Sequence, residues 1–332
     1  MLVLNEADVR TLLTMPDCIE AMHGVFTGMA QGAYFNPLRQ RARPEGNANW
    51  ITMMPVMRTA APRLWALKEM AVTPANAAQG LDPIQGAVML HDGDDGCLLA
   101  VVHAAALTAI RTAAVSAVAT RALARPDART VAIIGSGVQG RAHIEAMRCV
   151  LPLAQVRVWS RDPARALRLV ADAASGAGYS DAAPGKCDAV ASIEAAIRGA
   201  DVVCTVTAAL EPVTQAQWFA PGCHLNAVGS STPAAQEIDA TTLARASLFV
   251  DRREAALAES GDILAALRVQ AITPTHIRAE LGEVLIGRQP GRSTAQEFTL
   301  YKALGFAALD LAAAELAVRR ARERGVGVEV PW

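Results

Sequence analysis

The sequence predicts an α/β protein: a Rossmann-type, doubly wound nucleotide domain joined to an α+β domain. The first observation is an apolar run at 131–134 that ends in Gly-Ser-Gly-Val-Gln-Gly at 135–140 and precedes helix-prone residues. The second is the alternation of apolar strands and helical stretches after this turn, which is typical of a parallel sheet covered on both faces. Strands are expected at 131–134, 155–159, 201–207, 224–228 and 247–251.

Composition narrows the class of protein. A chain of 332 residues is long enough for two domains. Its net charge of -1, without any basic run, argues against a nucleic-acid partner. No leader-like segment and no membrane-length apolar stretch is visible, so we expect a soluble cytoplasmic protein. The six cysteines and the histidines lack metal-ligand spacing, so no metal is expected.

The part before the glycine turn mixes helices and strands. Apolar residues at helical spacing predict a helix over 15–30. Strands are expected at 50–54 and 64–70, and a hairpin joins strands at 84–91 and 97–103. The acidic turn 92–96 between them lacks the closing glutamate of a calcium loop, so a hairpin turn is favoured. A long Ala-rich helix is expected over 107–124.

The end of the chain predicts one more long helix, over 299–324, that returns to the first domain. We therefore expect one domain from residues 1–112 with 313–332. The nucleotide domain is expected to span 113–312.

The glycines of the turn fit a dinucleotide site. Gly135 permits a sharp turn, Gly137 lets the backbone approach a pyrophosphate, and Gly140 lets the helix pack on the strand. The helix N-terminus presents unpaired N–H groups and partial positive charge to phosphates. A merely structural turn is the alternative.

The end of the second strand bears on the choice of cofactor. NAD-preferring domains place a carboxylate there, but this chain has Ser160 and Arg161, which suit a 2′-phosphate. Asp162 precedes Pro163 and is interpreted as a helix cap. NADPH is therefore expected, with NADH possible; alternatively, Arg161 is only a solvated turn residue.

The first domain contains cations in apolar surroundings, Lys68 and Arg111, and an alternating set at 39, 41 and 43. Alternation would place Arg39, Arg41 and Arg43 on one face of a strand. They could be solvated edge residues or a clamp for a carboxylate. The residues alone do not decide between these interpretations.

Short motifs occur in a fixed order over nearly the whole chain. They are Pro37-Leu38-Arg39, Met54-Pro55, Lys68, Arg111-Thr112-Ala113-Ala114, the glycine turn, 199–207, 222–231, Asp251, 254–257, 259–262 and Thr299-Leu300-Tyr301-Lys302. In this order they resemble the ornithine cyclodeaminase/mu-crystallin family. The resemblance implies a homodimer whose first domain binds both the substrate and the partner subunit.

The resemblance also implies roles for individual residues. Arg39, Lys68 and Arg111 would hold a substrate carboxylate against the nicotinamide, and Arg41 could replace Arg39. The expected cofactor contacts are Thr112, Gly135, Ser136, Gly137, Val138, Gln139, Gly140, Ser160, Arg161, Thr207, Val228 and Gly229.

Two departures from the cyclodeaminase pattern point to another branch. Ser231 stands where similar cyclodeaminases carry an aspartate, and Thr52 stands where they carry a glutamate. Ser231 instead resembles the mu-crystallin branch, unless it is a plain loop residue. This implies NADPH-dependent reduction of cyclic ketimine carboxylates, Δ1-pyrroline-2-carboxylate or Δ1-piperideine-2-carboxylate, to L-proline or L-pipecolate.

The proton that the imine needs is expected from Lys68, or from a water held by Ser231 or Gln85. His224, in an apolar strand, is interpreted as a core histidine rather than a base. Three other functions stay open: ornithine cyclodeamination, an alanine-type dehydrogenase, and a non-catalytic NADPH-dependent binding protein.

Overall fold

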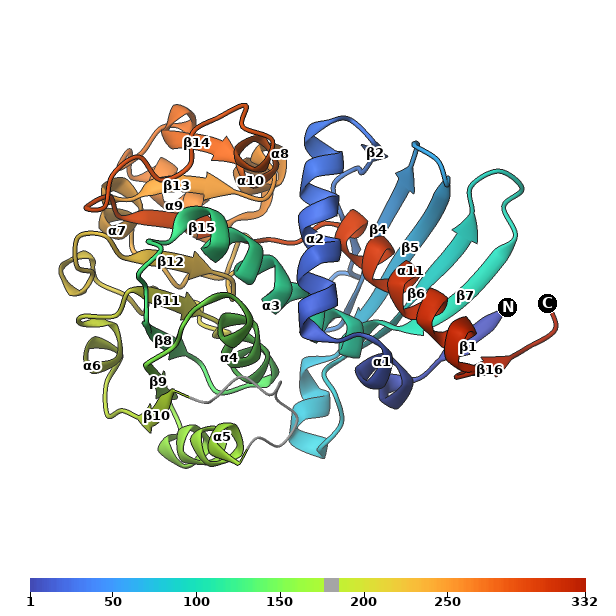
Figure 1. Cartoon of the computed structure of the whole chain (residues 1–332), viewed down its shortest axis with the longest axis horizontal. Coiled ribbons are helices and arrows are strands. Elements are labelled where there is room, and N and C mark those ends of the chain that lie inside the picture. Colours follow the sequence, from blue (N-terminus) through green and yellow to red (C-terminus); the bar gives the residue numbers. More distant parts are fainter. Residues whose placement is uncertain (176–184) are drawn as a thin grey trace. The chain divides into compact units, whose positions relative to one another are not determined.

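The computed structural model describes residues 1–175 and 185–332, and these form two compact units (Figure 1). The first unit comprises Met1–Thr112 and Phe306–Trp332, and the second comprises Ala113–Gly305. The return to the first unit thus occurs at residue 306 and not at the expected 313. The whole C-terminal helix belongs to the first unit, because the chain changes direction at Gly305, whose φ is 74°.

The first unit contains a mixed sheet in the order β16-β1-β7-β6-β5-β4-β2, with β3 also paired to β4. Its strands are β1 (Leu2–Leu4), β2 (Tyr34–Phe35), β3 (Gln40–Ala42), β4 (Trp50–Arg58), β5 (Leu64–Val72), β6 (Ile84–Asp92), β7 (Leu98–His103) and β16 (Val328–Glu329). Its helices are α1 (Glu6–Leu12), α2 (Met15–Ala30), the 3-10 turn η1 (Pro74–Gln79), the start of α3 (Ala104–Leu123), and α11 (Ala307–Arg324). Helix α11 packs on β4, β5 and β6, and α2 packs on α11.

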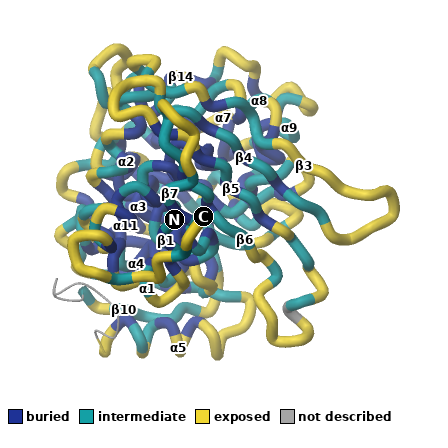
Figure 2. The backbone as a smooth tube through the Cα atoms, turned by 90° about the vertical axis from the view of Figure 1, so that its right-hand side faces the viewer, coloured by how far each residue is buried: buried dark blue, intermediate teal, exposed yellow. Residues whose placement is uncertain are grey.

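Side chains of this sheet alternate between two faces. On the inner face, under α11, cross-strand pairing aligns Met54, Lys68, Val88 and Val102 in one buried row. The neighbouring outer row is Pro55, Leu67, Met89 and Val101, and its members are only half-buried. Figure 2, in which teal marks intermediate burial, shows much of β4 and β6 in that colour.

Pro55 lies in the middle of β4, where proline is uncommon because it cannot donate to a ladder. On that edge β4 pairs with β3 through residues 51–53 and with β2 through residues 57–58. Pro55 therefore lies between the part of β4 that pairs with β3 and the part that pairs with β2.

The second unit is built on eight parallel strands in the order β10-β9-β8-β11-β12-β15-β13-β14. The strands are β8 (Thr130–Ile134), β9 (Gln155–Trp159), β10 (Lys186–Ala189), β11 (Val202–Thr205), β12 (His224–Ala227), β13 (Ser247–Val250), β14 (Ile277–Glu280) and β15 (Thr299–Lys302). The helices and 3-10 turns are α4 (Val138–Val150), α5 (Pro163–Ala174), α6 (Ile193–Ile197), η2 (Ala216–Trp218), α7 (Ala240–Arg245), α8 (Arg253–Glu259), α9 (Gly261–Arg268), η3 (Pro274–His276) and α10 (Leu281–Leu285).

The strand order confirms the Rossmann-type fold. From β8 the chain moves outward to β9 and β10, then returns to β11 on the other side of β8. Ligands of such sheets bind where the strand order reverses, outside the carboxyl ends of the strands. The glycine turn follows β8, beside the reversal between β8 and β11, which is the position where such sheets bind nucleotides.

The five expected strands of this sheet are confirmed, but the expected helix over 299–324 is wrong in its first part. Residues Thr299–Lys302 form β15, which lies between β12 and β13 (Figure 1). Asp251 then accepts hydrogen bonds from the N–H groups of Leu304 and Gly305 at 2.7 and 2.6 Å. This contact and the left-handed Gly305 separate the strand from α11.

The hairpin prediction for β6 and β7 is confirmed. The Asp92 side chain accepts hydrogen bonds from the N–H groups of Asp94 and Asp95, at 2.8 and 3.3 Å, and so closes the acidic turn on itself. Among the residues that the structure describes, no helix combines the length and apolarity needed to cross a membrane.

Candidate functional site

The inner face of the first unit buries two cations around one carboxylate. Lys68 on β5 and Arg111 on α3 are 3% and 6% exposed, and Asp310 on α11 is 1% exposed. One oxygen, Oδ1 of Asp310, lies 2.9 Å from Lys68 Nζ and 2.9 Å from Arg111 Nε. Lys68 also donates to the Thr108 hydroxyl at 2.6 Å. Two positive charges thus share one negative charge.

Burial lowers the pKa of Lys68 to about 8. Asp310 opposes this shift, whereas the charges of Arg111 and Arg39 add to it. The ammonium therefore titrates close to neutral pH, where a lysine can exchange protons during a reaction. Burial also acts on Asp310, but the two cations hold the pKa of its carboxyl below the usual value.

Arg39, Arg41 and Thr52 lie on the side of the sheet that carries Lys68. Arg41 pairs with Thr52, which is opposite Met70 on the inner face. Arg41 is exposed, whereas Arg39 is half-buried and close enough to affect Lys68. Arg39 is therefore the better partner for Lys68 and Arg111. Thr112 follows Arg111 on α3 and is half-buried.

Gln85 is not brought to this cluster. Gln85 pairs with Ala71, whereas the adjacent residues Met70 and Gly86 pair in the inner row that contains Thr52. Since neighbouring residues of a strand point to opposite faces, Gln85 lies on the outer face of the sheet. Its amide donates to the Asp82 carbonyl at 3.4 Å, and its side chain is exposed. The expected substrate contact of Gln85 is therefore corrected: strand alternation turns it away from Lys68.

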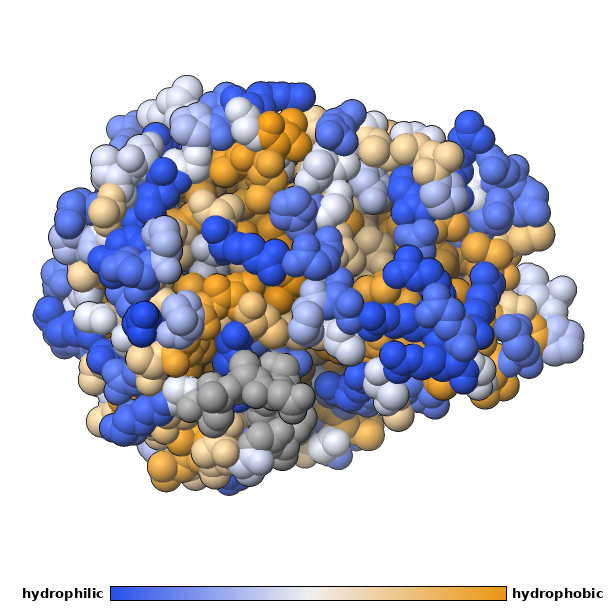
Figure 3. Space-filling model, in the orientation of Figure 1, coloured by the Kyte–Doolittle hydropathy of each residue, from blue (hydrophilic) through white to orange (hydrophobic). Residues whose placement is uncertain are grey.

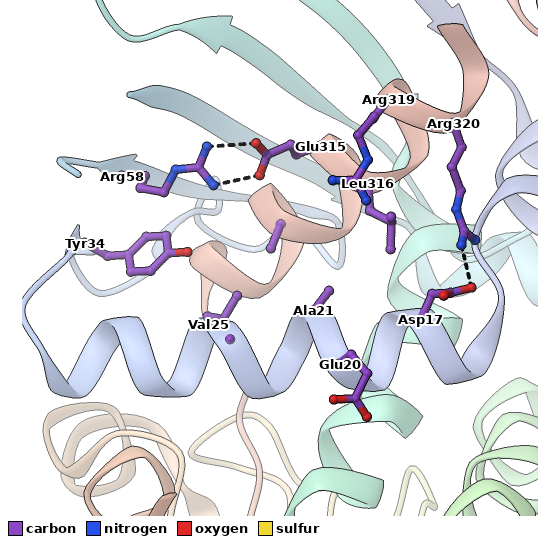
Figure 4. A pocket seen from close by; sticks show the side chains of 12 residues that line it. Asp17, Glu20, Ala21, Val25, Tyr34, Arg58, Glu315, Leu316, Arg319 and Arg320 are labelled. Atoms are coloured by element: carbon purple, nitrogen blue, oxygen red, sulfur yellow. Dashed lines mark hydrogen bonds and ion pairs between the residues drawn. The ribbon is translucent and has the colours of Figure 1, made fainter. Parts of the chain in front are cut away.

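A groove of about 540 Å³ between α2 and α11 offers a contrast within the same unit (Figure 4). Arg58 there makes two bonds to Glu315, at 2.7 and 2.8 Å, and Arg320 pairs with Asp17 at 2.6 Å. Hydrophilic side chains also gather over the C-terminal half of α11 on the face drawn in Figure 3. Because these arginines already have carboxylate partners, the groove lacks the surplus charge of the buried cluster.

The glycine turn of the second unit has the geometry expected of a phosphate site. Gly135 has a φ of 123°, and a Cβ there would lie 2.7 Å from the Val206 carbonyl oxygen. A Cβ on Gly140 would lie 2.2 Å from the Gly135 carbonyl oxygen, so only glycine fits. Gly137, the N-cap of α4, has no atom within 4 Å of such a Cβ. The turn therefore leaves open space in front of the first N–H groups of α4, which suits a pyrophosphate.

The end of β9 lies beside this turn. The Ser136 hydroxyl donates to the Ser160 hydroxyl at 2.7 Å. Asp162 accepts from the Ala164 N–H at 3.0 Å and caps α5, which confirms its interpretation as a helix cap. Arg161 is exposed and has no ion pair within residues 1–175 and 185–332.

The other predicted cofactor residues follow β11 and β12 at the same carboxyl edge of the sheet. They are Thr207, Val228 and Gly229, with Val138 and Gln139 at the start of α4. Ser231 lies in the loop after β12 and is half-buried. Since all strands are parallel, these residues meet on one edge. The predicted cofactor-binding residues of the second unit thus lie at one edge of its sheet. Thr112, the remaining predicted cofactor contact, belongs to the first unit.

Two buried histidines of this unit are structural. His224 contacts Thr299 Oγ1 at 2.9 Å, and burial with the charge of Arg292 lowers its pKa to about 3. His143 contacts Ser116 at 2.9 Å, and burial lowers its pKa to about 4. Both are neutral at pH 7, as expected for His224.

Sequence reasoning missed Asp310 and Thr108 in the first unit and Glu237 in the second. Asp310 lies 242 residues from Lys68 in the chain, so no local pattern links them. Its only signal is one acidic residue in the apolar Ala-Leu-Asp-Leu-Ala run of 308–312. Glu237 carries no motif and is recognisable only by its buried contacts.

The sequence profile of the ornithine cyclodeaminase/mu-crystallin family matches residues 1–325 of this chain. The chain is 35% identical to the ketimine reductase mu-crystallin of Mus musculus over 298 residues, which cover 90% of this chain and 89% of that protein. It is 32% identical over 336 residues to a Δ1-pyrroline-2-carboxylate reductase of Bacillus cereus, covering 100% of each.

Solved structures of similar proteins have the same fold over nearly the whole chain. The Thermococcus litoralis Δ1-pyrroline-2-carboxylate reductase, in complex with NADH and L-proline, superposes with a TM-score of 0.94 at 33% identity, covering 99% of this chain and 100% of that one. An archaeal alanine dehydrogenase dimer with bound NAD has a TM-score of 0.92 at 27% identity, covering 100% of this chain and 99% of that one.

Proposed function

Because the chain belongs to the ornithine cyclodeaminase/mu-crystallin family and is an oxidoreductase of the C=N bond of imino acids, we propose that its substrates are cyclic ketimine carboxylates. The reaction is the reduction of Δ1-pyrroline-2-carboxylate to L-proline or of Δ1-piperideine-2-carboxylate to L-pipecolate. Relatives named as Δ1-pyrroline-2-carboxylate reductases and as ketimine reductases support cyclic imines as the first compounds to test.

The observation that carries this proposal is the buried Lys68–Asp310–Arg111 cluster. Its unbalanced positive charge, with Arg39 nearby, attracts a ligand with one carboxylate. A bound carboxylate would complete the charge balance that the protein leaves open.

The chain's own residues divide the work of the reaction. Arg111 and Arg39 bind and orient the carboxylate, which fixes the position of the adjacent C=N bond. Lys68 gives a proton to the imine nitrogen and recovers it from solvent, a role that suits a pKa of about 8. When bound, the reduced nicotinamide supplies the hydride that the imine carbon accepts.

NADPH is the preferred cofactor in this proposal. Ser160 and the exposed Arg161 follow β9, and the nearby carboxylate of Asp162 is occupied by its helix cap. A 2′-phosphate would therefore meet a free guanidinium and a hydroxyl rather than a repelling carboxylate. Similar structures hold NADH or NAD, so both cofactors belong in the assay.

A homodimer is the proposed assembly. The outer face of the first unit's sheet carries an apolar row of Pro55, Leu67, Met89 and Val101, with Trp65 nearby at 48% exposure. An apolar sheet face of this kind is suited to burial against a second copy. The mass in solution should be that of two chains, and Leu67→Asp should reduce it to that of one. An unchanged mass in the variant would place the interface elsewhere.

A substrate panel tests the activity. Oxidation of NADPH and NADH is followed with both cyclic imines, with 2-oxo acids plus ammonia, and with ornithine plus NAD. We expect fast turnover only of a cyclic imine, and no proline from ornithine because Thr52 and Ser231 replace carboxylates. Preferred turnover of an oxo acid with ammonia would indicate an alanine-type dehydrogenase. Binding without turnover would indicate a binding protein.

A further inference from the structure

Glu237 is fully buried in the second unit and joins the loops that follow two neighbouring strands. Its Oε1 accepts the Thr207 N–H at 2.6 Å, and its Oε2 accepts the Gly229 N–H at 2.7 Å. Oε2 also accepts from the Thr205 hydroxyl at 3.0 Å. One carboxylate thus connects the loop after β11 with the loop after β12.

The carboxylate is itself held from behind. Asp262 Oδ1 accepts the N–H groups of Glu237 and Ile238 at 2.7 and 3.0 Å. Asp262 Oδ2 in turn pairs with Lys302 Nζ at 2.8 Å, and both side chains are fully buried. Burial raises the pKa of Glu237, and the charge of Lys302 together with the contact to Thr207 opposes that shift.

The two loops are close together at this point. A Cβ on Gly229 would lie 2.1 Å from the Thr207 carbonyl oxygen and 2.5 Å from Glu237 Oε1. No side chain fits between the loops, so their separation is set by the carboxylate and by the bare backbone of Gly229.

We propose that Glu237 is a positioning residue of the cofactor site, which fixes the spacing of the Thr207 and Gly229 loops against which the nicotinamide cofactor binds. This rests on the proposed function, in which both loops contact the cofactor. A carboxylate is required because it accepts from both main-chain N–H groups at once. In glutamine the amide nitrogen is a donor, so one of the two N–H groups loses its acceptor.

The test compares Glu237→Gln with the unmodified protein. We expect the Kd for NADPH or NADH to rise about 10- to 100-fold, the loss of one bond to a charged acceptor. The KM for the cofactor should rise with it, while the KM for the imine stays within about threefold, because the carboxylate site lies in the other unit. Thr205→Val removes only the hydroxyl contact and should lower the melting temperature without raising the Kd. Glu211→Gln, at an exposed position, serves as the control.

Gly229→Ala supplies a second route to the same loops, because its methyl group would clash with the Thr207 carbonyl oxygen and with Glu237 Oε1 and so displace the loops while the Glu237 side chain keeps its chemical identity. It should raise the Kd for the cofactor in the same way. An unchanged Kd in soluble Glu237→Gln, or insolubility of both variants, would overturn the positioning role. If the unmodified protein binds no nicotinamide cofactor, the proposed function itself fails.

Discussion

The buried charges of the two units are arranged differently. In the first unit, Lys68 and Arg111 share the single carboxylate of Asp310, so positive charge is in excess. In the second, the carboxylates of Glu237 and Asp262 lie near one cation, Lys302, so negative charge is in excess. Both clusters are almost completely shielded from solvent.

The two clusters differ in the groups that compensate their surplus charge. The extra carboxylate of the second unit is satisfied by the main-chain N–H groups of Thr207 and Gly229, within the protein. Among residues 1–175 and 185–332, Lys68 and Arg111 donate to the Asp310 carboxylate and the Thr108 hydroxyl, so the extra cation has no second carboxylate as a partner. The cluster of the first unit is therefore suited to binding an anionic ligand, and the cluster of the second unit is suited to holding loops in a fixed position.

The largest effect is expected from removing the excess cation. Arg111→Ala should lower kcat/KM for the imine, because a buried charge pair with the substrate carboxylate is lost. The fall should correspond to about 2–5 kcal/mol of transition-state binding free energy. The Kd for the cofactor, measured separately, should change little. Arg319→Ala, an exposed cation on α11, is the control. Unchanged kcat/KM in Arg111→Ala would contradict the carboxylate clamp.

Removing the shared carboxylate should mainly affect stability. Asp310→Asn leaves two cations without their counter-charge, which we expect to lower the free energy of unfolding by about 3 kcal/mol. Denaturant unfolding at pH 7 measures this. A loss below about 1 kcal/mol, typical of surface pairs, would show that the cluster is not electrostatically coupled.

The pH profile tests the state of Lys68. Because its pKa is lowered to about 8, kcat/KM should be flat below that pH and fall about tenfold per pH unit above it, as the ammonium loses its proton. Asp310 raises this pKa, so in Asp310→Asn the limb should move to lower pH. A limb that stays in place in the variant would assign the titration to another group.

The smallest effect is expected at the cofactor ribose. Arg161→Ala should shift the ratio of kcat/KM for NADPH over NADH about tenfold toward NADH, since an exposed guanidinium contributes modestly. Ser160→Asp should shift it in the same direction by repulsion. Arg168→Ala, exposed on the following helix, should leave the ratio unchanged. Were the unmodified protein to prefer NADH, the 2′-phosphate site would not be here.

The second unit's fold was largely predictable because its signals are local. The glycine turn and the apolar strand at 155–159 lie next to their helices in sequence, and the latter has the bounds expected. The strands Lys186–Ala189 and Ile277–Glu280 were not predicted, and Thr299–Lys302 was assigned to a helix. That last strand is short and gains its hydrogen bonds from β12 and β13, which lie far from it in the chain. The hydrophobic periodicity of a segment carries no information about pairing with strands that are distant in the sequence.

The candidate site was predictable in its cations and in the glycine turn, but not in what holds them. Lys68 and Arg111 stand out as charges within apolar runs. Asp310 and Glu237 become meaningful only when distant segments meet, and Gln85 could be excluded only once strand pairing fixed its face. Resemblance to a family readily indicates which residues contact a ligand. It indicates less readily which other residues hold the ligand-contacting residues in position.

The most direct test of the account measures the rate of NADPH oxidation with Δ1-pyrroline-2-carboxylate, in the unmodified protein and in Arg111→Ala, under the same conditions. We expect rapid, cofactor-dependent formation of L-proline by the unmodified protein. In the variant we expect the fall in kcat/KM to correspond to a loss of about 2–5 kcal/mol of transition-state binding free energy, with cofactor binding retained. No proline from the unmodified protein, or equal rates in the two proteins, would contradict it.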